Sequence, residues 1–489
     1  MTLFPRPLVN SLALALLGFV ASPLAASEGP LDAKTVATTR QLVEAAKSDT
    51  GAYALVESLT TEVGPRMAGT PAFDRAVEWA QARFKALGYD RVYLEPVSYP
   101  TWRRGHERAE VVSPFPQPLH LTALGGTVGT GATPLEAEVV EFATLAALKA
   151  APEGSLAGKI AYIANRMDRA RDGSGYGPAV AARSGASDAA AKGALALLIR
   201  SIGTDSDRFP HTGQQRYAAG GPQIPAAALS NPDADLLSAM LRRGQPVKLR
   251  LDLDVGQSGV TSSTYNVIGE IRGRGKLADE VVLIGGHLDS WDLGTGAIDD
   301  GAGVAITMAA GALIGKLDHA PRRTIRVVAF ANEEQGLFGA RAYAEAHKDQ
   351  MEKHQLGAES DFGARRIYAL SAGVSPEARP VLEQVAGLLA PLGIAYAPTG
   401  GGPGPDLGPS VRLGMPWAEL QQDGSQDHHA ERIDVDLVGI FVEQTEHDQV
   451  DQSPHEVQHE QALPVRVDLG CDRHEVVIVH RHCRHCSCL

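Results

Sequence analysis

Short apolar strands alternate with helical segments between residues 265 and 370, and this alternation constrains the fold most strongly. The apolar runs have the length of buried strands and lie at 265–271, 281–286, 324–331 and 366–370. Helical patterns separate them at 301–316 and 336–347. This order predicts an α/β fold with a largely parallel sheet covered by helices on both faces. Polar residues that follow the strands are therefore expected to meet at one edge of the sheet, where binding sites form.

Residues 120–258 have a different composition, rich in alanine, valine and glycine. Short apolar strands are expected in this region at 137–142, 160–163, 194–199 and 247–253, with a helical pattern over 175–192. The region contains no tight cluster of catalytic residue types. We interpret it as a β-rich module that acts as a lid, restricts the substrate or docks a partner. The preceding part is expected to form helices at 34–49, 51–64 and 70–87 and a strand at 91–97.

The first 27 residues are typical of a secretory signal peptide. Arg6 gives a basic start, residues 8–20 form an apolar run, and small residues follow at 25–27. This run is shorter than the roughly 20 residues that span a bilayer, so an uncleaved anchor is the less favoured alternative. We find no later segment that is expected to span a membrane, and we expect the mature protein to be secreted or periplasmic.

The last segment, residues 426–489, differs abruptly from the rest of the chain. It holds 13 acidic residues against 5 arginines, 9 of the 16 histidines and all 4 cysteines. We interpret it as the product of a frameshift near residue 425. A metal-binding tail that uses Cys483 and Cys486 is one alternative, and a disordered end is another.

The cysteines and the charge of the whole chain exclude two further features. The main body is expected to fold without disulfides, and the net charge of −13 argues against a nucleic-acid partner.

Two motifs near the second predicted strand carry chemistry. GGHLDSWD (285–292) places His287 and Asp289 on the same side of an extended chain, because side chains alternate with a period of two. Both could bind a metal, or Asp289 could orient the ring of His287. In GAIDDGAG (296–303), Asp299 and Asp300 precede a helix, where a carboxylate could also serve simply as a cap.

Two further acidic motifs follow later in the chain. FANEEQGLFGA (330–340) places Glu333 and Glu334 directly after a strand, and AESDFGA (358–364) contains Asp361, which alone is typical of a turn. Adjacent like charges are costly unless a cation offsets them. One histidine and several carboxylates without sulfur suit Zn²⁺, Mn²⁺ or Co²⁺. The carboxylates exceed the needs of one tetrahedral zinc, so we predict two bridged metals and a hydrolytic reaction with a Glu as general base.

With these motifs at this separation, the sequence resembles the co-catalytic dizinc aminopeptidases, most closely their carboxypeptidase Q branch. VGPRMAGTP (63–71) and QQDGS (421–425) extend the resemblance to about residues 56–425. The resemblance implies the zinc exopeptidase fold, a mixed and mostly parallel sheet sandwiched by helices. It also implies that residues 120–258 are a protease-associated domain inserted between two parts of the catalytic domain, 28–119 and 259–425.

The resemblance implies roles for single residues. The implied metal ligands are one histidine and three carboxylates from the four motifs, completed by a histidine of QDGSQDHHAERID: His287, Asp299 as the bridge, Glu334, Asp361 and His429 or, alternatively, His428. Glu333 resembles the general base of a metal-bridging hydroxide, and Asp289 resembles the carboxylate that orients His287. In GGGPGPDLGPSV (400–411), Asp406 is a candidate partner for the substrate's amino group, with a flexible surface turn as the alternative.

The sequence thus predicts an exported metallo-exopeptidase that uses two zinc ions to hydrolyse dipeptides or short peptides at one terminus. Manganese or cobalt could replace the zinc, and a homodimer is compatible with the resemblance. The residues around His429 depart from the family's pattern, so the alternative is a metal-poor, inactive homologue that acts as a binding ectodomain. A single-zinc acyltransferase of related fold, such as a glutaminyl cyclase, is a third hypothesis.

Overall fold

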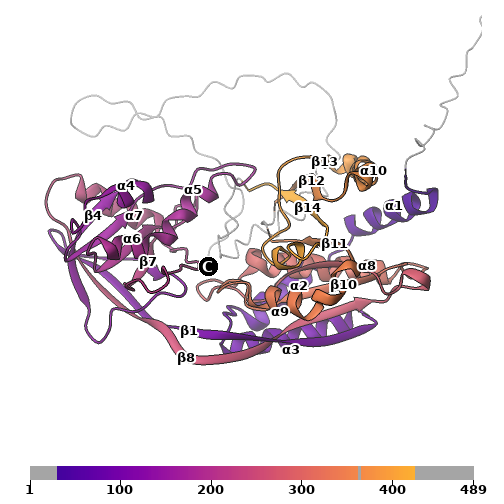
Figure 1. Ribbon diagram of the computed structural model, residues 1–489, viewed down its shortest axis with the longest axis horizontal. Helices are drawn as coiled ribbons and strands as arrows, with labels where there is room; N and C mark the ends of the chain where they lie inside the picture. The colour runs from indigo at the N-terminus through magenta and orange to yellow at the C-terminus, as the bar shows by residue number, and fades with distance from the viewer. Residues whose placement is uncertain (1–29, 362–364, 425–489) are drawn as a thin grey trace, which may run out of the picture. The chain divides into compact units, whose positions relative to one another are not determined.

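The computed structural model describes residues 30–361 and 365–424 (Figure 1). The predicted signal peptide, the acidic tail, His428 and His429 lie outside the described residues. The described part begins with α1 (Ala33–Lys47), α2 (Gly51–Ser58) and a π-helical turn (Leu59–Val63). Their bounds are close to those of the helices predicted at 34–49 and 51–64.

A mixed sheet forms the core of the part that carries the acidic motifs. Its strands lie in the order β13-β12-β14-β11-β9-β10-β8. Their bounds are Lys248–Ile271 (β8), Val281–His287 (β9), Thr324–Phe330 (β10), His354–Glu359 (β11), Ile367–Gly373 (β12), Ala395–Tyr396 (β13) and Trp417–Gln422 (β14). The central strands β14, β11, β9 and β10 are parallel, whereas β8 and β12 pair antiparallel with their neighbours. The predicted mixed, mostly parallel sheet is confirmed.

Helices cover both faces of this sheet, as the alternation of buried side chains requires. On β10, Val327 packs with the residues of α3 (Pro71–Ala86) and α8 (Gly303–Gly315) on one face. Its neighbour Val328 packs on the other face, together with Tyr343 of α9 (Phe338–His347). The helix α3 starts at a capping Thr70, whose side chain accepts the N–H of Phe73, and at Pro71, as its sequence predicts. Two further helices of this part are α10 (Arg379–Leu389) and the short α11 (Gly408–Val411).

One described stretch, residues 297–315, is long and apolar enough to cross a membrane by composition alone. It contains α8, and 67% of the apolar window is buried inside the protein. Val304 and Met308 of this helix belong to the hydrophobic core beside α3. The apolar character of the stretch is therefore explained by its central position in the fold.

Residues 120–258, which we call the inserted region, extend the same sheet beyond β8 with their own strands and helices. The sheet continues in the order β8-β4-β5-β6-β7-β3. The elements are β3 (Leu121–Ala123), β4 (Leu135–Phe142), β5 (Lys159–Ile163), β6 (Ala196–Arg200), β7 (Ala226–Leu229), α4 (Leu145–Ala150), α5 (Tyr176–Val180), α6 (Ala186–Ala191) and α7 (Asn231–Leu241). The predicted helix over 175–192 is split into α5, a 3₁₀ turn at Ala181–Gly185, and α6. This region buries its own apolar clusters on both faces of the strands.

A long antiparallel ribbon connects the inserted region to the rest of the sheet (Figure 1). β1 (Arg91–Ser113) pairs with β8 from Arg91 opposite Glu270 to Ser113 opposite Lys248, and a short β2 (Gln117–Leu119) pairs with β1. The sequence predicted only the apolar ends of this ribbon, at 91–97, 247–253 and 265–271. The pairing is irregular between Pro100 and Trp102, opposite residues 258–260. The predicted boundary after residue 258 falls at this irregularity, within a strand.

Candidate metal centre

The acidic motifs meet at the carboxyl ends of three neighbouring parallel strands. β9 ends at His287, β10 is followed by Glu333 and Glu334, and β11 is followed by Asp361. Because β11, β9 and β10 are adjacent and parallel, these ends lie side by side. Ligand atoms of His287, Asp299 and Glu334 lie within 4.8 Å of one another, and so do those of His287, Asp300 and Asp361.

The ring of buried His287 is oriented so that one nitrogen faces the carboxylates. Its Nδ1 lies 3.0 Å from the main-chain carbonyl of Asp289, which can accept a hydrogen bond from it. Its Nε2 lies 2.9 Å from Oδ1 of Asp299 and 3.4 Å from Oδ1 of Asp361. A ring with Nδ1–H bound to a carbonyl presents Nε2 as a metal ligand, the arrangement found in many metal sites.

Asp289 supports the site through both its main chain and its side chain. Its carboxylate accepts the N–H of Glu333 at 3.0 Å and that of Glu334 at 3.3 Å. The same carboxylate lies 3.6 Å from Nδ1 of His287, farther than the main-chain carbonyl. In this structure Asp289 therefore orients the His287 ring through its carbonyl and holds the Glu333–Glu334 turn through its carboxylate.

Asp299 and Asp300 face different partners, and a cis peptide bond joins them. The buried carboxylate of Asp300 accepts the N–H of Gly303, at the start of α8, and the N–H of His287, both at 3.0 Å. The alternative of a capping role thus describes Asp300 well. Asp299 instead faces the Nε2 of His287, which lies 2.9 Å from its Oδ1.

The electrostatics of the cluster favour a bound cation. Burial raises the pKa of Glu333 to about 8, the carboxylates of Asp361, Asp289 and Asp299 add to this effect, and His287 opposes it. Burial also raises the pKa of Glu334 well above its usual range, with Asp299 as the next cause. Divalent cations would offset this repulsion, and the nitrogen and oxygen donors suit zinc. The described residues therefore fit a zinc site.

Arg66 is a buried part of the site that the sequence indicated only through the motif VGPRMAGTP. Its side chain is 0% exposed. Nε donates to the carbonyl of Leu288 at 2.6 Å, Nη1 to that of Thr295 at 2.6 Å, and Nη2 to that of Gly296 at 2.8 Å. The guanidinium thus fixes residues 288–296, which we call the metal loop because it joins His287 to Asp299.

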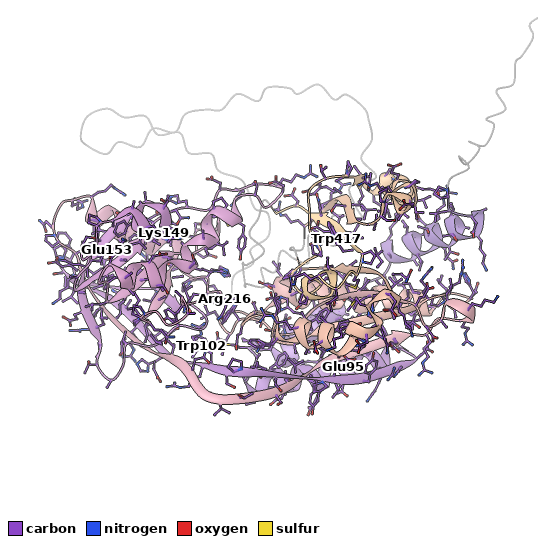
Figure 2. The ribbon with its side chains drawn as sticks, viewed as in Figure 1. Glu95, Trp102, Lys149, Glu153, Arg216 and Trp417 are labelled. Carbon is purple, nitrogen blue, oxygen red and sulfur yellow. The ribbon has the colours of Figure 1, made fainter. Side chains whose placement is uncertain are left out.

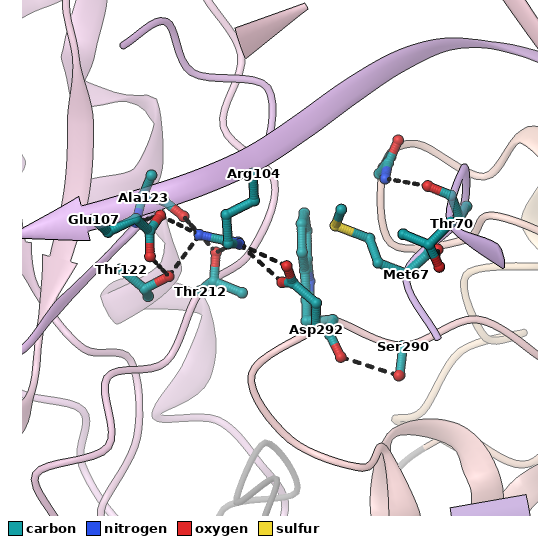
Figure 3. Close-up of polar contacts among 12 residues, drawn as sticks. Met67, Thr70, Arg104, Glu107, Thr122, Ala123, Thr212, Ser290 and Asp292 are labelled. Atoms are coloured by element: carbon teal, nitrogen blue, oxygen red, sulfur yellow. Dashed lines mark hydrogen bonds and ion pairs between the residues drawn. The ribbon is translucent and has the colours of Figure 1, made fainter. Parts of the chain in front are cut away.

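Arg104 of β1 holds the metal loop from the side of the inserted region (Figure 3). Its side chain is 6% exposed, and it pairs with Asp292 of the metal loop at 2.8 Å and with Glu107 at 2.5 Å. It also donates to the side chain of Thr122 at 2.7 Å and to the carbonyl of Ala123 at 3.0 Å. This contact links the ribbon, the inserted region and the metal loop.

Glu359 and Asp406 form a second acidic pair near the candidate metal centre. The sequence analysis identified only Asp406. The carboxylate of Glu359 accepts the N–H groups of Asp406 and Leu407 at 3.0 to 3.2 Å. Asp406 is 1% exposed, so the alternative of a surface turn is wrong for this residue. Neither of its carboxylate oxygens has a hydrogen-bond partner among the described residues. Burial raises the pKa of Asp406, and the carboxylates of Glu359 and Glu333 add to the rise.

The fold and the buried nitrogen and oxygen donors define a zinc-dependent metallo-exopeptidase. Residues 266–436 match the sequence profile of Peptidase family M28. The chain is 36% identical to carboxypeptidase Q of Bos taurus over 379 residues, 77% of this chain and 78% of the relative. It is 35% identical to carboxypeptidase Q of Homo sapiens over the same shares of the two chains. This chain belongs to peptidase family M28.

Solved structures support the same assignment. A Peptidase M28 precursor from Shewanella amazonensis is 50% identical, with a TM-score of 0.79 over 81% of this chain and 90% of the other. A zinc aminopeptidase from Bacillus subtilis is 19% identical, with a TM-score of 0.55 over 81% of this chain and 94% of the other, and shows the shared fold.

Proposed function

We propose that this protein hydrolyses dipeptides or short peptides at one terminus, using two zinc ions, after export to the periplasm or beyond. The observation that carries the proposal is the buried convergence of His287, Asp299, Glu334 and Asp361 at the ends of adjacent strands. The printed names of the relatives, carboxypeptidase Q and zinc aminopeptidase, agree with an exopeptidase that acts on peptides. In this proposal residues 120–258 are a protease-associated domain that helps to restrict the substrate.

The ligands are proposed to form two sets that share Asp299. His287 and Asp361 would hold one ion, and Glu334 with His429 would hold the other. The set of five proposed ligands supports two ions, because a single tetrahedral zinc has only four ligand positions. Zinc at this site would supply Lewis-acid chemistry, polarising the peptide carbonyl and making a water molecule easier to deprotonate.

Glu333 is proposed as the general base. It takes a proton from the attacking water and returns it to the leaving amine as the carbon–nitrogen bond breaks. Its position supports this role, since Asp289 fixes its main chain at 3.0 Å and burial keeps its pKa above the usual range of a carboxyl. Asp406, with both carboxylate oxygens unpartnered among the described residues, is proposed to receive the substrate's amino group.

The decisive test compares the wild-type protein with Glu333→Gln. We expect both proteins to purify with about two zinc ions per chain, and kcat on a dipeptide to fall by about 10²- to 10⁴-fold in the variant. Glu345→Gln is the matched control, because Glu345 is exposed and pairs only with Lys348 among the described residues. Near-normal turnover by Glu333→Gln would show that Glu333 is not the general base. A wild-type protein that purified without zinc and was inactive would contradict the whole proposal.

A further inference from the structure

The inserted region contacts the edge of the sheet that carries the metal ligands at several places. At this edge the parallel strands end in the order β14, β11, β9 and β10. Asp361 follows β11, His287 ends β9, and Glu334 follows β10. The inserted region meets this edge after β14, after β9 and after β10. The ligands therefore lie between its two outer contacts.

The contact after β9 is apolar and buried. Trp291 of the metal loop is 1% exposed and packs in one hydrophobic cluster with Leu198 of β6 and Trp102 of β1. The rings of Trp291 and Trp102 lie edge to face, with their centroids 6.2 Å apart. A Cβ built on Gly125 would lie 2.1 Å from the ring of Trp291, so the indole fits directly against the main chain of the inserted region. The burial of this apolar surface keeps the contact formed.

The contact after β10 is made by one exposed side chain of the inserted region. A Cβ built on Gly336 would lie 3.9 Å from Nη2 of Arg216. Figure 2 labels Arg216 on the side of the inserted region that faces the metal-binding part. A long exposed side chain loses rotamer freedom when it is held in one place, so this contact adds little to the attachment of the inserted region.

The contact after β14 is polar and largely exposed, and we call its four residues, Arg171, Tyr368, Asp423 and Gly424, the latch. Arg171 lies in the loop 164–175, which precedes α5 and reaches the end of β14 (Figure 1). Its Cζ lies 4.1 Å from the centroid of the Tyr368 ring, its Nε lies 3.5 Å from Oδ2 of Asp423, and its carbonyl accepts the N–H of Gly424 at 2.8 Å. The side chains of Arg171 and Asp423 are 60% and 25% exposed, and ion pairs in such surroundings add little stability. The latch can therefore open while the buried contact after β9 stays formed.

While the latch is closed, the 164–175 loop packs directly on the chain that leaves β14. A Cβ built on Gly424 would lie 3.3 Å from the main-chain nitrogen of Gly173 and 3.4 Å from its Cα. Because both residues are glycines, the two main chains touch here without side chains between them, and an extended peptide cannot pass. The distance from β14 to β10 along the edge is three strand spacings, roughly 14 Å. An extended dipeptide of about 7 Å is shorter than this distance, whereas an extended octapeptide of about 26–29 Å exceeds it.

We propose that Arg171 holds the inserted region closed over the metal centre and thereby restricts the centre to peptides of a few residues. With the latch closed, a dipeptide fits between the outer contacts of the inserted region. A longer peptide reaches the centre only when Arg171 has left Tyr368 and Asp423, while Trp291 keeps the inserted region attached. This inference rests on the proposed peptidase function and assigns its preference for short peptides to a positioning residue outside the ligand cluster.

The first test compares dialanine with a soluble octapeptide that begins and ends with Ala-Ala. We expect the zinc-loaded wild-type protein to hydrolyse the dipeptide with a kcat/KM about 10-fold or more above that of the octapeptide. Arg171→Ala should raise kcat/KM on the octapeptide by about 5-fold or more and should not raise the value on the dipeptide. Tyr368→Leu should act in the same direction, whereas Tyr368→Phe keeps the aromatic ring under Arg171 and should match the wild-type protein. Arg166→Ala is the matched control, because Arg166 is an exposed arginine of the same loop that pairs with Asp235 inside the inserted region.

Hydrogen exchange measures the latch independently of peptidase activity. The amides of residues 417–424 include the N–H that Gly424 donates to Arg171. In Arg171→Ala these amides should exchange about 5-fold or more faster than in the wild-type protein, while those of the metal loop keep their wild-type rates. Arg166→Ala should change neither group of amides.

Each outcome of these tests decides a separate point. If Arg171→Ala changed neither the exchange of residues 417–424 nor the preference for the dipeptide, the latch would be refuted and the peptidase function would stand. Faster exchange with an unchanged preference, or a wild-type protein that cleaved both peptides equally well, would refute the control of peptide length. If the zinc-loaded wild-type protein cleaved neither peptide, the proposed function would fail and the length selection with it, while hydrogen exchange would still decide whether Arg171 closes the contact.

Discussion

Arg66 shows how a single side chain can fix the geometry of the candidate metal centre without touching a metal. Its three shortest hydrogen bonds all go to main-chain carbonyls of the metal loop. Burial lowers the pKa of Arg66 to about 10, and the carboxylates of Asp289 and Asp300 oppose the fall. The guanidinium therefore remains charged at neutral pH, where it offsets part of the negative charge of the cluster.

Replacement of Arg66 should test this role directly. Arg66→Met leaves several buried carbonyls without a donor and should lower the free energy of unfolding by about 3 kcal/mol or more. Arg66→Lys keeps the charge, but one ammonium cannot reach three carbonyls on a fixed fork, so it should recover only part of the loss. Urea unfolding monitored by circular dichroism measures both values. The exposed Arg40→Met serves as control, and a wild-type midpoint for Arg66→Lys would contradict the role of the fork.

At this scale the sequence revealed the residues that follow apolar strands and missed those defined by distant contacts. His287, Glu333 and Glu334 stand next to strand ends that periodicity locates, and Asp299 precedes a helix that periodicity locates, so their convergence could be predicted. Arg66 contacts Thr295, which lies 229 positions away along the chain. A contact between residues so far apart has no local signature in the sequence.

At the scale of elements, the ribbon of β1 and β8 is the feature that the sequence described least well. In its middle, residues 256–263 of β8 are exposed or half-buried and residues 103–108 of β1 are mostly charged, so the apolar alternation that identifies a half-buried strand is absent there. The central strands β9 and β10 are nearly continuous apolar runs and were located within about a residue. Pairing between strands, rather than burial, defines the ribbon, and pairing leaves little trace in a single sequence.

The contact between Arg104 and Asp292 should couple this ribbon to the metal loop energetically. A double-mutant cycle of Arg104→Met and Asp292→Asn should give a coupling energy of about 1–3 kcal/mol, because the arginine is largely desolvated. Arg103 and Asp254 provide the control, since they form an exposed pair on the same ribbon with the same distance of 2.8 Å. Their coupling should be less than about 1 kcal/mol. Equal coupling energies for the two pairs would show that the burial of Arg104 does not strengthen its interaction with Asp292.

At the scale of the whole molecule, the fold concentrates acidic side chains where its parallel strands end. Burial raises the pKa of Glu333, Glu334, Asp300 and Asp406 together. In the folded chain without metal these groups hold protons at a pH at which the unfolded chain has lost them. The stability of the chelated protein is therefore linked to pH, and the binding of zinc is linked to the release of protons.

This linkage predicts how zinc should protect the protein as pH changes. For Glu333 the pKa rises from 4.5 to about 8 on folding, so the chelated protein should lose stability as pH increases from about 4.5 to 8. Zinc requires ionised carboxylates, so its affinity should increase over the same interval. The gain in Tm on addition of zinc to chelated protein should therefore be small at pH 5.5 and largest near pH 8, as measured by scanning calorimetry. Glu333→Gln removes one of these titrations and should flatten the pH dependence. A gain in Tm that is the same at every pH would show that proton release from the buried carboxylates does not accompany metal binding.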